Sequence, residues 1–298
     1  MVCPCWPRWI NTDICKAKRV EMGSRIKEAF ARELAKTDNE INLAYAALLF
    51  AEYLSEPIDT AHNLSLLDEM TETIQSQISA AESDLQTVEI LNEFLFGELK
   101  FVGNANNYYH LHNSFLNKVL ELRTGIPIAL SVLYLEVGWR LGLPVWGVGL
   151  PGHFIVAYGS PSEPIYIDVF NQGRLLSEAD CLALARVPLS NRLAFREQFL
   201  KPVSKKAILY RMLLNLKQIF LKAENWEAAY QVIDLTLIVA PQQITELRDR
   251  GLVAYRLDRR QAAIFDLQRY LFLVPHATDV KWLRKRVETM EEELLRLN

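Results

Sequence analysis

Residues 125–158, GIPIALSVLYLEVGWRLGLPVWGVGLPGHFIVAY, contain the pattern that says most about the fold of the chain. Its first part is an apolar run that opens at Pro127, and proline suits the first turn of a helix because its missing N–H has no partner there in any case. After Gly142 the sequence changes to short β-rich runs, VWGVGL and HFIVAY, which glycine and proline turns separate. This order predicts an α+β unit in the middle of the chain.

A hairpin is expected at the end of this stretch. HFIVAY is followed by the turn-rich GSPSE and by another strand-like run, PIYIDVF (164–170). Pairing Tyr158 with Glu163 sets an antiparallel register. It places His153 opposite Asp168, where side chains on one face lie about 5 Å apart. A carboxylate beside an imidazole fixes its tautomer and stabilises its charged form, so the pair is a candidate site. A histidine that only closes a strand end is the alternative.

Helices are expected on both sides of the α+β unit. Residues 23–100 carry the helical periodicity of apolar residues, interrupted at Pro57 in SEPIDT. Beyond residue 203 the chain is helical again, and WEAAYQVIDLTLIVAP (226–241) aligns with RQAAIFDLQRYLFLVP (260–275) at a spacing of 34 residues. This spacing, with small residues where helices approach closely and a closing proline, is typical of tetratricopeptide repeats.

The predicted organisation therefore has four parts. They are a disordered leader (1–22), a helical N-terminal region (23–100), an α+β core (101–200) and tetratricopeptide-like helical repeats (203–298). Each repeat buries one face and stacks on its neighbours, which makes the concave face of the array a natural binding surface. Helices that only cover the core are the alternative interpretation of the last part.

Composition excludes several classes of protein. The formal net charge of −3 shows no basic excess, so a general nucleic-acid binder is not expected. No apolar run reaches the roughly 18 residues that span a bilayer. The first residues, MVCPCWPRWINTDIC, lack the apolar core of a signal peptide. A cytoplasmic protein with thiol cysteines and no membrane contact is expected, and the sequence leaves the oligomeric state open.

Two patterns suggest a bound group, and neither is favoured. Cys3, Cys5 and Cys15 are three residues where a structural zinc site needs four ligands. The chain also contains the GxGxxG spacing of a dinucleotide-binding loop, at Gly147, Gly149 and Gly152. That loop opens a helix in a β-α unit, whereas a strand-like run follows here. No metal and no cofactor is predicted.

The order of the motifs resembles the transglutaminase-like superfamily. GIP, a helix, RLGLP, a short strand, GHF and YID follow one another as in that superfamily, whose core holds a cysteine at a helix N-terminus facing a histidine and an aspartate. More closely, NSFLNKVLELRTGIPIALSVLYLEVGWRLGLPVWGVGLPGHFIV (113–156) resembles the SirB1 family, also called UPF0162. The resemblance extends over roughly residues 40–298. It implies a papain-type α+β core followed by tetratricopeptide-like repeats.

The resemblance also shows which catalytic group this chain lacks. In catalytic members of the superfamily the cysteine lies one helix before an Arg-x-Leu-Gly-Ile-Pro-like segment. Counting back from the corresponding segment at Arg140 leads to Pro127. A nucleophile must lose a proton, and proline has no group that can do so. The resemblance therefore implies that His153 and Asp168 are a vestigial pair.

His110 and His112 are a further departure from the family. They lie in YYHLHNSF, where SirB1 family members read more like YYDPRNSF. Together with His153 and Asp168 they form a conceivable metal site. A loop that leads into the next helix, capped by Asn113 or Ser114, is the favoured interpretation.

Three functional hypotheses follow. The favoured one is a non-catalytic adaptor that binds protein partners through its cleft and its helical repeats. Related domains in eukaryotic F-box proteins suggest, by analogy, partner recruitment in protein turnover. The second is a hydrolase or acyltransferase in which Ser131, one turn deeper on the helix, acts with His153 and Asp168. A buried helical serine commonly bonds the carbonyl four residues earlier instead. The third is a structural interaction protein in which the pair only stabilises the hairpin.

Overall fold

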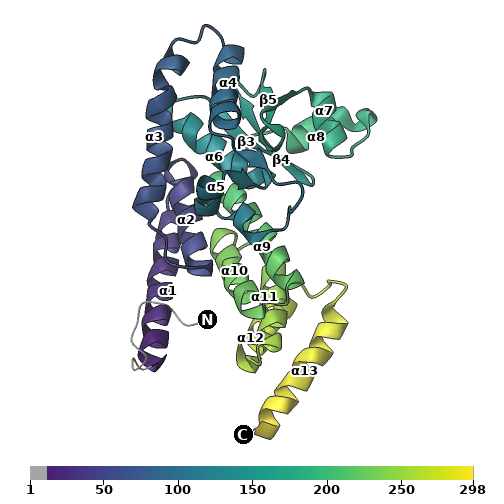
Figure 1. Ribbon diagram of the computed structural model, residues 1–298. Helices are drawn as coiled ribbons and strands as arrows, with labels where there is room; N and C mark the ends of the chain where they lie inside the picture. The colour runs from purple at the N-terminus through teal and green to yellow at the C-terminus, as the bar shows by residue number, and fades with distance from the viewer. Residues whose placement is uncertain (1–11, 298) are drawn as a thin grey trace.

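The computed structural model describes residues 12–297, which form an α+β core with helices before and after it (Figure 1). The core lies at one end of the molecule, and the C-terminal helices extend toward the other. This is the fold class that the sequence predicts. None of the helices within the described range is both long and apolar enough to cross a lipid bilayer.

The N-terminal part consists of helices, three of which begin at polar caps. The helices are α1 (Thr12–Leu34), α2 (Leu43–Leu54), α3 (Thr60–Ser79) and α4 (Asp84–Asn92), the last continued by a π-helical turn at Glu93–Glu98. The side chains of Asn42, Asp59 and Ser83 accept backbone N–H groups at the starts of α2, α3 and α4. The predicted break at Pro57 is confirmed between α2 and α3. The expected disordered leader covers residues 1–22. Residues 1–11 lie outside the described range, and α1 begins at Thr12, within the rest of the expected leader.

The core is built around one buried helix and a four-stranded sheet. Its helices are α5 (Leu116–Leu122), α6 (Pro127–Arg140), α7 (Glu178–Leu184) and α8 (Arg192–Phe199). Its strands are the short parallel pair β1 (Val102–Gly103) and β2 (Thr124–Gly125), and the antiparallel sheet β3 (Val145–Leu150), β4 (His153–Tyr158), β5 (Ile165–Asp168) and β6 (Arg174–Leu176), in that order. Residues 127–138 of α6 are all buried, and α6 packs against β3 and β4. The sheet thereby holds the start of α6 in a fixed place.

The register between β4 and β5 differs from the predicted one. Tyr158 pairs with Ile165, not with Glu163. The reason is the turn, in which the N–H of Glu163 donates to the carbonyl oxygen of Ser160 at 3.0 Å and is therefore used locally. The shift amounts to two residues, which leaves every side chain on its expected face. His153 and Asp168 consequently share a face as diagonal neighbours instead of direct opposites.

The C-terminal part is an array of antiparallel helices. It contains α9 (Lys205–Lys222), α10 (Trp226–Val239), α11 (Thr245–Arg256), α12 (Arg260–Leu273) and α13 (Val280–Leu297). The two aligned sequence segments form α10 and α12, each the second helix of a hairpin. Helices α11 and α12 approach closely at Gly251, where an added Cβ would lie 2.7 Å from Cγ of Leu267. This arrangement agrees with the predicted repeats.

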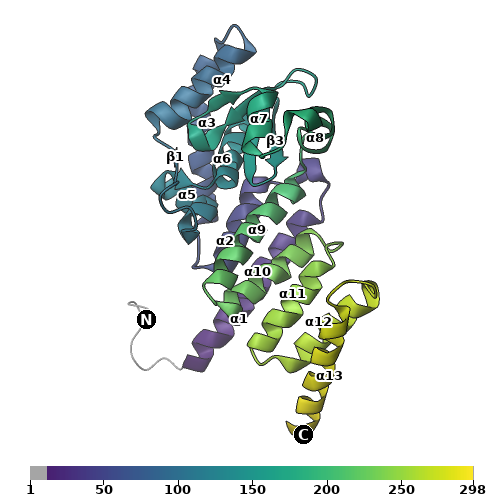
Figure 2. The ribbon, with the colours of Figure 1, turned by 90° about the vertical axis from the view of Figure 1, so that its right-hand side faces the viewer.

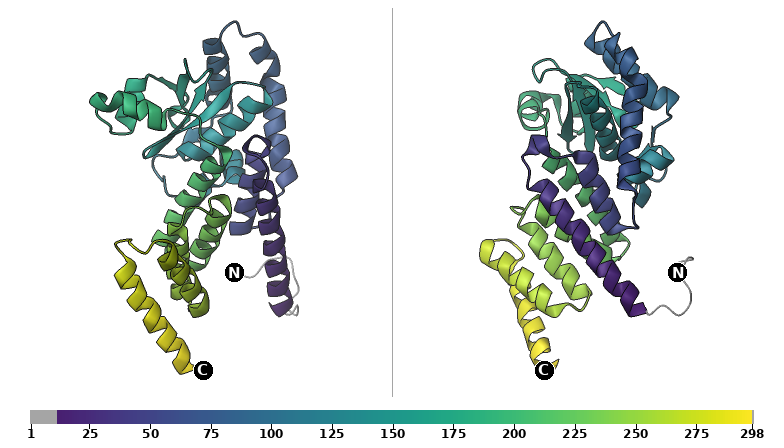
Figure 3. Two further views of the ribbon diagram at one scale, coloured as in Figure 1. Left: turned by 180° about the vertical axis from the view of Figure 1, so that it is seen from behind. Right: turned by 90° about the vertical axis from the view of Figure 1, so that its left-hand side faces the viewer.

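Helix α9 joins the array to the rest of the molecule (Figure 2). The carboxylate of Asp38 accepts the backbone N–H groups of Lys205 and Lys206 and so caps α9 from the N-terminal part. The ammonium group of Lys205 donates to the carbonyl oxygen of Ile41 at 2.7 Å. Helix α1 packs on both α2 and α10, as Figure 3 shows from behind. The first helices of the array are therefore fixed against the N-terminal part.

Candidate functional site

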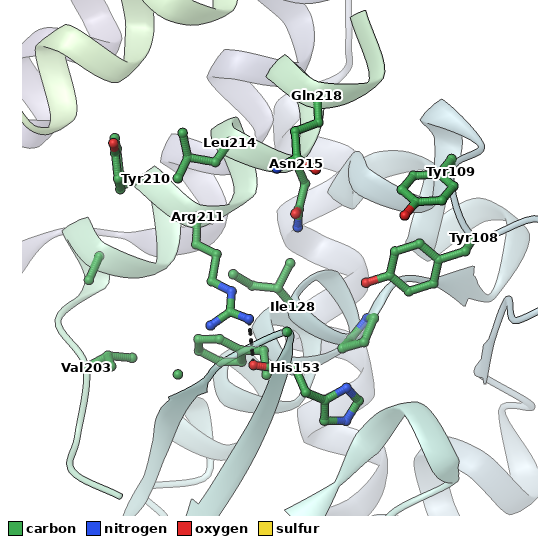
Figure 4. Close-up of a pocket in the computed structure, with 15 residues that line it drawn as sticks. Tyr108, Tyr109, Ile128, His153, Val203, Tyr210, Arg211, Leu214, Asn215 and Gln218 are labelled. Carbon is green, nitrogen blue, oxygen red and sulfur yellow. Dashed lines mark hydrogen bonds between the residues drawn. The ribbon is translucent and has the colours of Figure 1, made fainter. Parts of the chain in front are cut away.

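A cleft of about 610 Å³ lies between the β3–β4 hairpin and α9 (Figure 4). Its walls come from the loop at Tyr108 and Tyr109, from the first residues of α6, from the hairpin and from one face of α9. Pro127 and His153 both line it. The cleft therefore lies where the resemblance implies the active site of a catalytic relative.

His153 and Asp168 form a hydrogen-bonded pair in the wall of this cleft. Nε2 of His153 lies 3.0 Å from Oδ1 of Asp168, and the Asp168 side chain is only 1% exposed. Nδ2 of Asn171 donates to the other carboxylate oxygen at 2.6 Å. Burial acts to raise the pKa of Asp168, but the hydrogen bonds from His153 and Asn171 outweigh it and hold the pKa below its usual value. The carboxylate therefore stays charged and orients the imidazole.

Asp168→Asn is expected to lower the free energy of unfolding by an amount that depends on pH and is lost in acid. Because the folded-state pKa is lowered, the contribution of Asp168 is fully present above the unfolded-state pKa of about 3.9 and disappears as pH falls through the folded value. The variant should be less stable than the parent by about 1–3 kcal/mol at neutral pH, as expected for lost hydrogen bonds to a charged group. The difference should shrink below about pH 4. Urea unfolding between pH 7 and pH 3 measures it, and a difference independent of pH would contradict this role.

Pro127 is the first residue of α6 and is buried. The helix begins without a side-chain cap at Ile126, and a proline at this position leaves one backbone N–H fewer to satisfy. The structural role of Pro127 is therefore clear, and its ring offers no group that could attack a substrate.

Ser131 lies one turn further along α6, away from the lining of the cleft. Its side chain is fully buried, and its hydroxyl donates to the carbonyl oxygen of Pro127 at 2.8 Å. Within the described residues it makes no hydrogen bond to His153. The geometry is that of a helical serine bonded to its own backbone.

His110 and His112 do not line the cleft. Nδ1 of His110 accepts the backbone N–H of His112 at 3.4 Å, on the surface next to the turn Leu111–Ser114. In residues 12–297 no group of three or more histidine, cysteine, aspartate or glutamate side chains is placed to hold a metal ion. Cys3 and Cys5 lie outside the described range, and Cys15 lies in α1.

The glycine pattern does not open a helix, and the buried cysteine is not an activated nucleophile. Gly147 and Gly149 lie in β3, and Gly152 lies in the turn before β4, so a strand and not a helix follows the pattern, as predicted. Cys181 is buried in α7, and burial raises the pKa of its thiol to about 12. A thiol with this pKa stays protonated at neutral pH and is a poor nucleophile.

Arg211 and Asn171 are the site residues that sequence reasoning misses. Nη2 of Arg211 donates to the carbonyl oxygen of His153 at 2.6 Å, and the guanidinium lies 5.5 Å from the ring centre of Phe154. Burial lowers the pKa of Arg211. The spacing of Arg211, Asn215 and Gln218 along one face of α9 is the signal that points to a polar stripe on this helix.

Comparison with known proteins agrees with this architecture. A transglutaminase-like superfamily model matches residues 61–214, and a tetratricopeptide repeat model matches residues 216–288. A UPF0162 protein of Xylella fastidiosa is 34% identical over 267 residues, which cover 87% of this chain and 94% of that protein. Protein SirB1 of Salmonella typhimurium is 24% identical over 261 residues, with 87% of this chain and 97% of that protein covered.

Over a shorter region, the chain is also similar to a mammalian protein. F-box only protein 21 of Mus musculus is 34% identical over 181 residues, which cover 57% of this chain and 28% of that protein. The two family models meet inside α9, between residues 214 and 216, so the helix that forms one wall of the cleft belongs partly to each.

Proposed function

Because this chain belongs to the transglutaminase-like superfamily and, within it, to the UPF0162 or SirB1 family, we propose that it is a non-catalytic protein-binding module built on a catalytic fold. The cleft binds a segment of a partner protein, and the tetratricopeptide repeats provide a second binding surface. The observation that supports this most is that Pro127 begins α6 in the wall of the cleft that His153 also lines.

The chemistry of the cleft supports binding over catalysis. His153 and Asp168 are arranged to accept and hold a proton, but acyl transfer also needs a nucleophile beside the imidazole. The lining of the cleft contains no cysteine, serine or threonine. Tyr108 and Tyr210 are not activated, because burial raises the pKa of both phenols. An oriented imidazole without a nucleophile is suited to hydrogen bonding with a ligand.

The similarity to F-box only protein 21 supports the same role. The matching region covers 28% of that protein, so this fold serves there as one module of a longer chain. We place the interaction in the cytoplasm, as the sequence predicts, with protein partners and without nucleic acid or membrane.

Filling the cleft is expected to abolish partner capture. Ala207 lies on the exposed face of α9 and lines the cleft, so Ala207→Trp places a large ring in it without changing His153 or Asp168. Ala61→Trp, on the exposed side of α3 outside the cleft, is the matched control. Affinity capture from native lysate should recover the same partners with the parent and the control.

Ala207→Trp should lose these partners by at least about tenfold, since an occupied cleft excludes the segment. Retention of the same partners by Ala207→Trp would show that binding uses another surface. Recovery of nothing beyond an unrelated control protein would contradict the binding role itself.

A further inference from the structure

Arg211 is a cation without an acidic partner in the wall of the cleft. Within the described residues its one hydrogen bond goes from Nη2 to the carbonyl oxygen of His153, at 2.6 Å, and it takes part in no salt bridge. A guanidinium has five N–H donors in a planar fork that matches a carboxylate. Figure 4 shows the group extending from α9 toward the hairpin. A partly buried charge that lacks a counter-charge is costly, so an anion bound beside it would be stabilising.

The rest of the lining favours an anion as well. Arg211 and His153 are the ionisable groups of the lining apart from its tyrosines, and the lining contains no aspartate or glutamate. Asp168 is already bonded to His153 and Asn171. A Cβ added at Gly149 would lie 3.5 Å from Nη1, an ordinary van der Waals contact, so the backbone of β3 passes close to this donor.

Ser114 is a buried polar residue with an unpartnered hydroxyl next to the cleft. Its side chain is 1% exposed, and its hydroxyl has no hydrogen-bond partner. It lines a small extension of about 10 Å³, whose walls include Tyr108, Asn215 and Gln218 of the main cleft. Buried hydroxyl groups nearly always have a partner. The extension is about the size of one polar group or one water, so the orphan hydroxyl points to a polar occupant there.

The length of the face of α9 that lines the cleft, from Ala207 to Gln218, indicates an extended segment. From Ala207 to Gln218 the helix rises about 16 Å, which about five residues of extended chain span. The carboxamides of Asn215 and Gln218 make no hydrogen bond within the described residues, and such groups pair readily with a peptide backbone. Arg211 stands one turn inside this face and not at its end. Its carboxylate partner is therefore a side chain of a passing segment and not a chain terminus.

From these observations we infer that the cleft binds an extended protein segment that carries an aspartate or glutamate, with the side-chain carboxylate paired to Arg211. The inference rests on the proposed binding role of the cleft and names the class of segment that it accepts. Charge-assisted pairs of this kind are about twice as strong as neutral hydrogen bonds, so one acidic residue should dominate selection.

A displayed library of random nine-residue segments, flanked on both sides by fixed linkers, tests this on the full-length protein. The parent should enrich segments with aspartate or glutamate at one position. Changing that residue to its amide in the best segment should weaken binding at least about tenfold. Arg211→Gln should lose the acidic preference and bind the acidic and amide segments equally. Arg269→Gln, at an exposed position of α12, is the matched control and should behave like the parent.

The outcomes separate this inference from the proposed function. Enrichment without an acidic residue, or an acidic preference that survives Arg211→Gln, would overturn the inference and leave cleft binding standing. Selection only from a second library with free carboxyl termini would also overturn it, because the carboxylate would then come from a chain end. Enrichment of no segment would overturn both. If Arg211→Gln fails to fold, the acid-to-amide exchange in the segment gives the same readout on the parent.

Discussion

Pro127→Cys is expected to create a thiol that iodoacetamide alkylates at pH 6 about tenfold faster than an ordinary cysteine. The new side chain would stand at the N-terminus of α6, in the cleft that His153 lines. A helix N-terminus and a neighbouring imidazolium lower a thiol pKa from about 8.5 to values between about 3.5 and 7.5. With a pKa near 6.5, the fraction of thiolate at pH 6 is nearly a hundredfold larger than for a thiol of pKa about 8.5. A more acidic thiol is a weaker nucleophile, which lowers the rate by about a factor of eight.

The readout must be specific for position 127, because the chain has four other cysteines. Mass spectrometry of the peptide that contains residue 127 provides it. Cys181 is an internal reference, since a thiol with a pKa of about 12 should remain unmodified. The matched control is Pro127→Cys combined with His153→Ala, which keeps the helix and removes the imidazole. Equal and ordinary rates in both variants would mean that position 127 is not the equivalent of the nucleophile position.

Lys217→Met is expected to lower the local stability of the helical array by about 3–5 kcal/mol. Nζ of Lys217 lies 2.8 Å from Glu246 and 2.5 Å from Asp249, and the side chains of Lys217 and Glu246 are 9% and 4% exposed. Thr236 also donates to the Glu246 carboxylate. Removing one partner of a buried ion pair leaves an uncompensated charge, which is the costly event, whereas replacing both partners with apolar residues is often close to neutral.

Hydrogen exchange of the amides in α9, α10 and α11 measures this loss where it arises. Lys217→Met combined with Glu246→Leu should recover most of it, because the most deeply buried carboxylate is then gone and Asp249 keeps its ion pair with Arg248. Lys281→Met, at an exposed position of α13, is the matched control and should change stability by less than about 0.5 kcal/mol. Equal exchange in the parent and Lys217→Met would show that the pair does not hold α9 to the next hairpin.

The parts of the fold that sequence predicts are those with a local cause. Proline at the start of α6, the alternation in β4 and β5, and the aligned segments of α10 and α12 each impose their element on a short stretch. The register between β4 and β5 is missed because it depends on the turn. In the turn, the N–H of Glu163 donates to the carbonyl oxygen of Ser160. A shift of two residues leaves the alternation of apolar and polar residues unchanged, so the sequence pattern cannot distinguish the two registers.

The candidate site also contains residues that the local sequence predicts and residues that only the folded chain brings together. His153 and Asp168 are close in sequence and share a sheet face in either register, so their pairing follows from alternation alone. Arg211 follows His153 by 58 residues, and only the packing of α9 against the hairpin brings them together. Asn171 is near Asp168 in sequence, but it reaches the carboxylate through the short helical turn Val169–Asn171, which the strand pattern does not predict.

The most direct test of non-catalytic binding is the intact mass of a captured partner. The partner is incubated with the parent and, separately, with a folded variant that carries His153→Ala and Asp168→Ala. Loss of a non-catalytic pair should leave the partner's mass the same in both incubations and equal to that of the untreated partner. A mass change that occurs with the parent and is absent with the variant would mean that the pair supports a reaction, and would contradict the account.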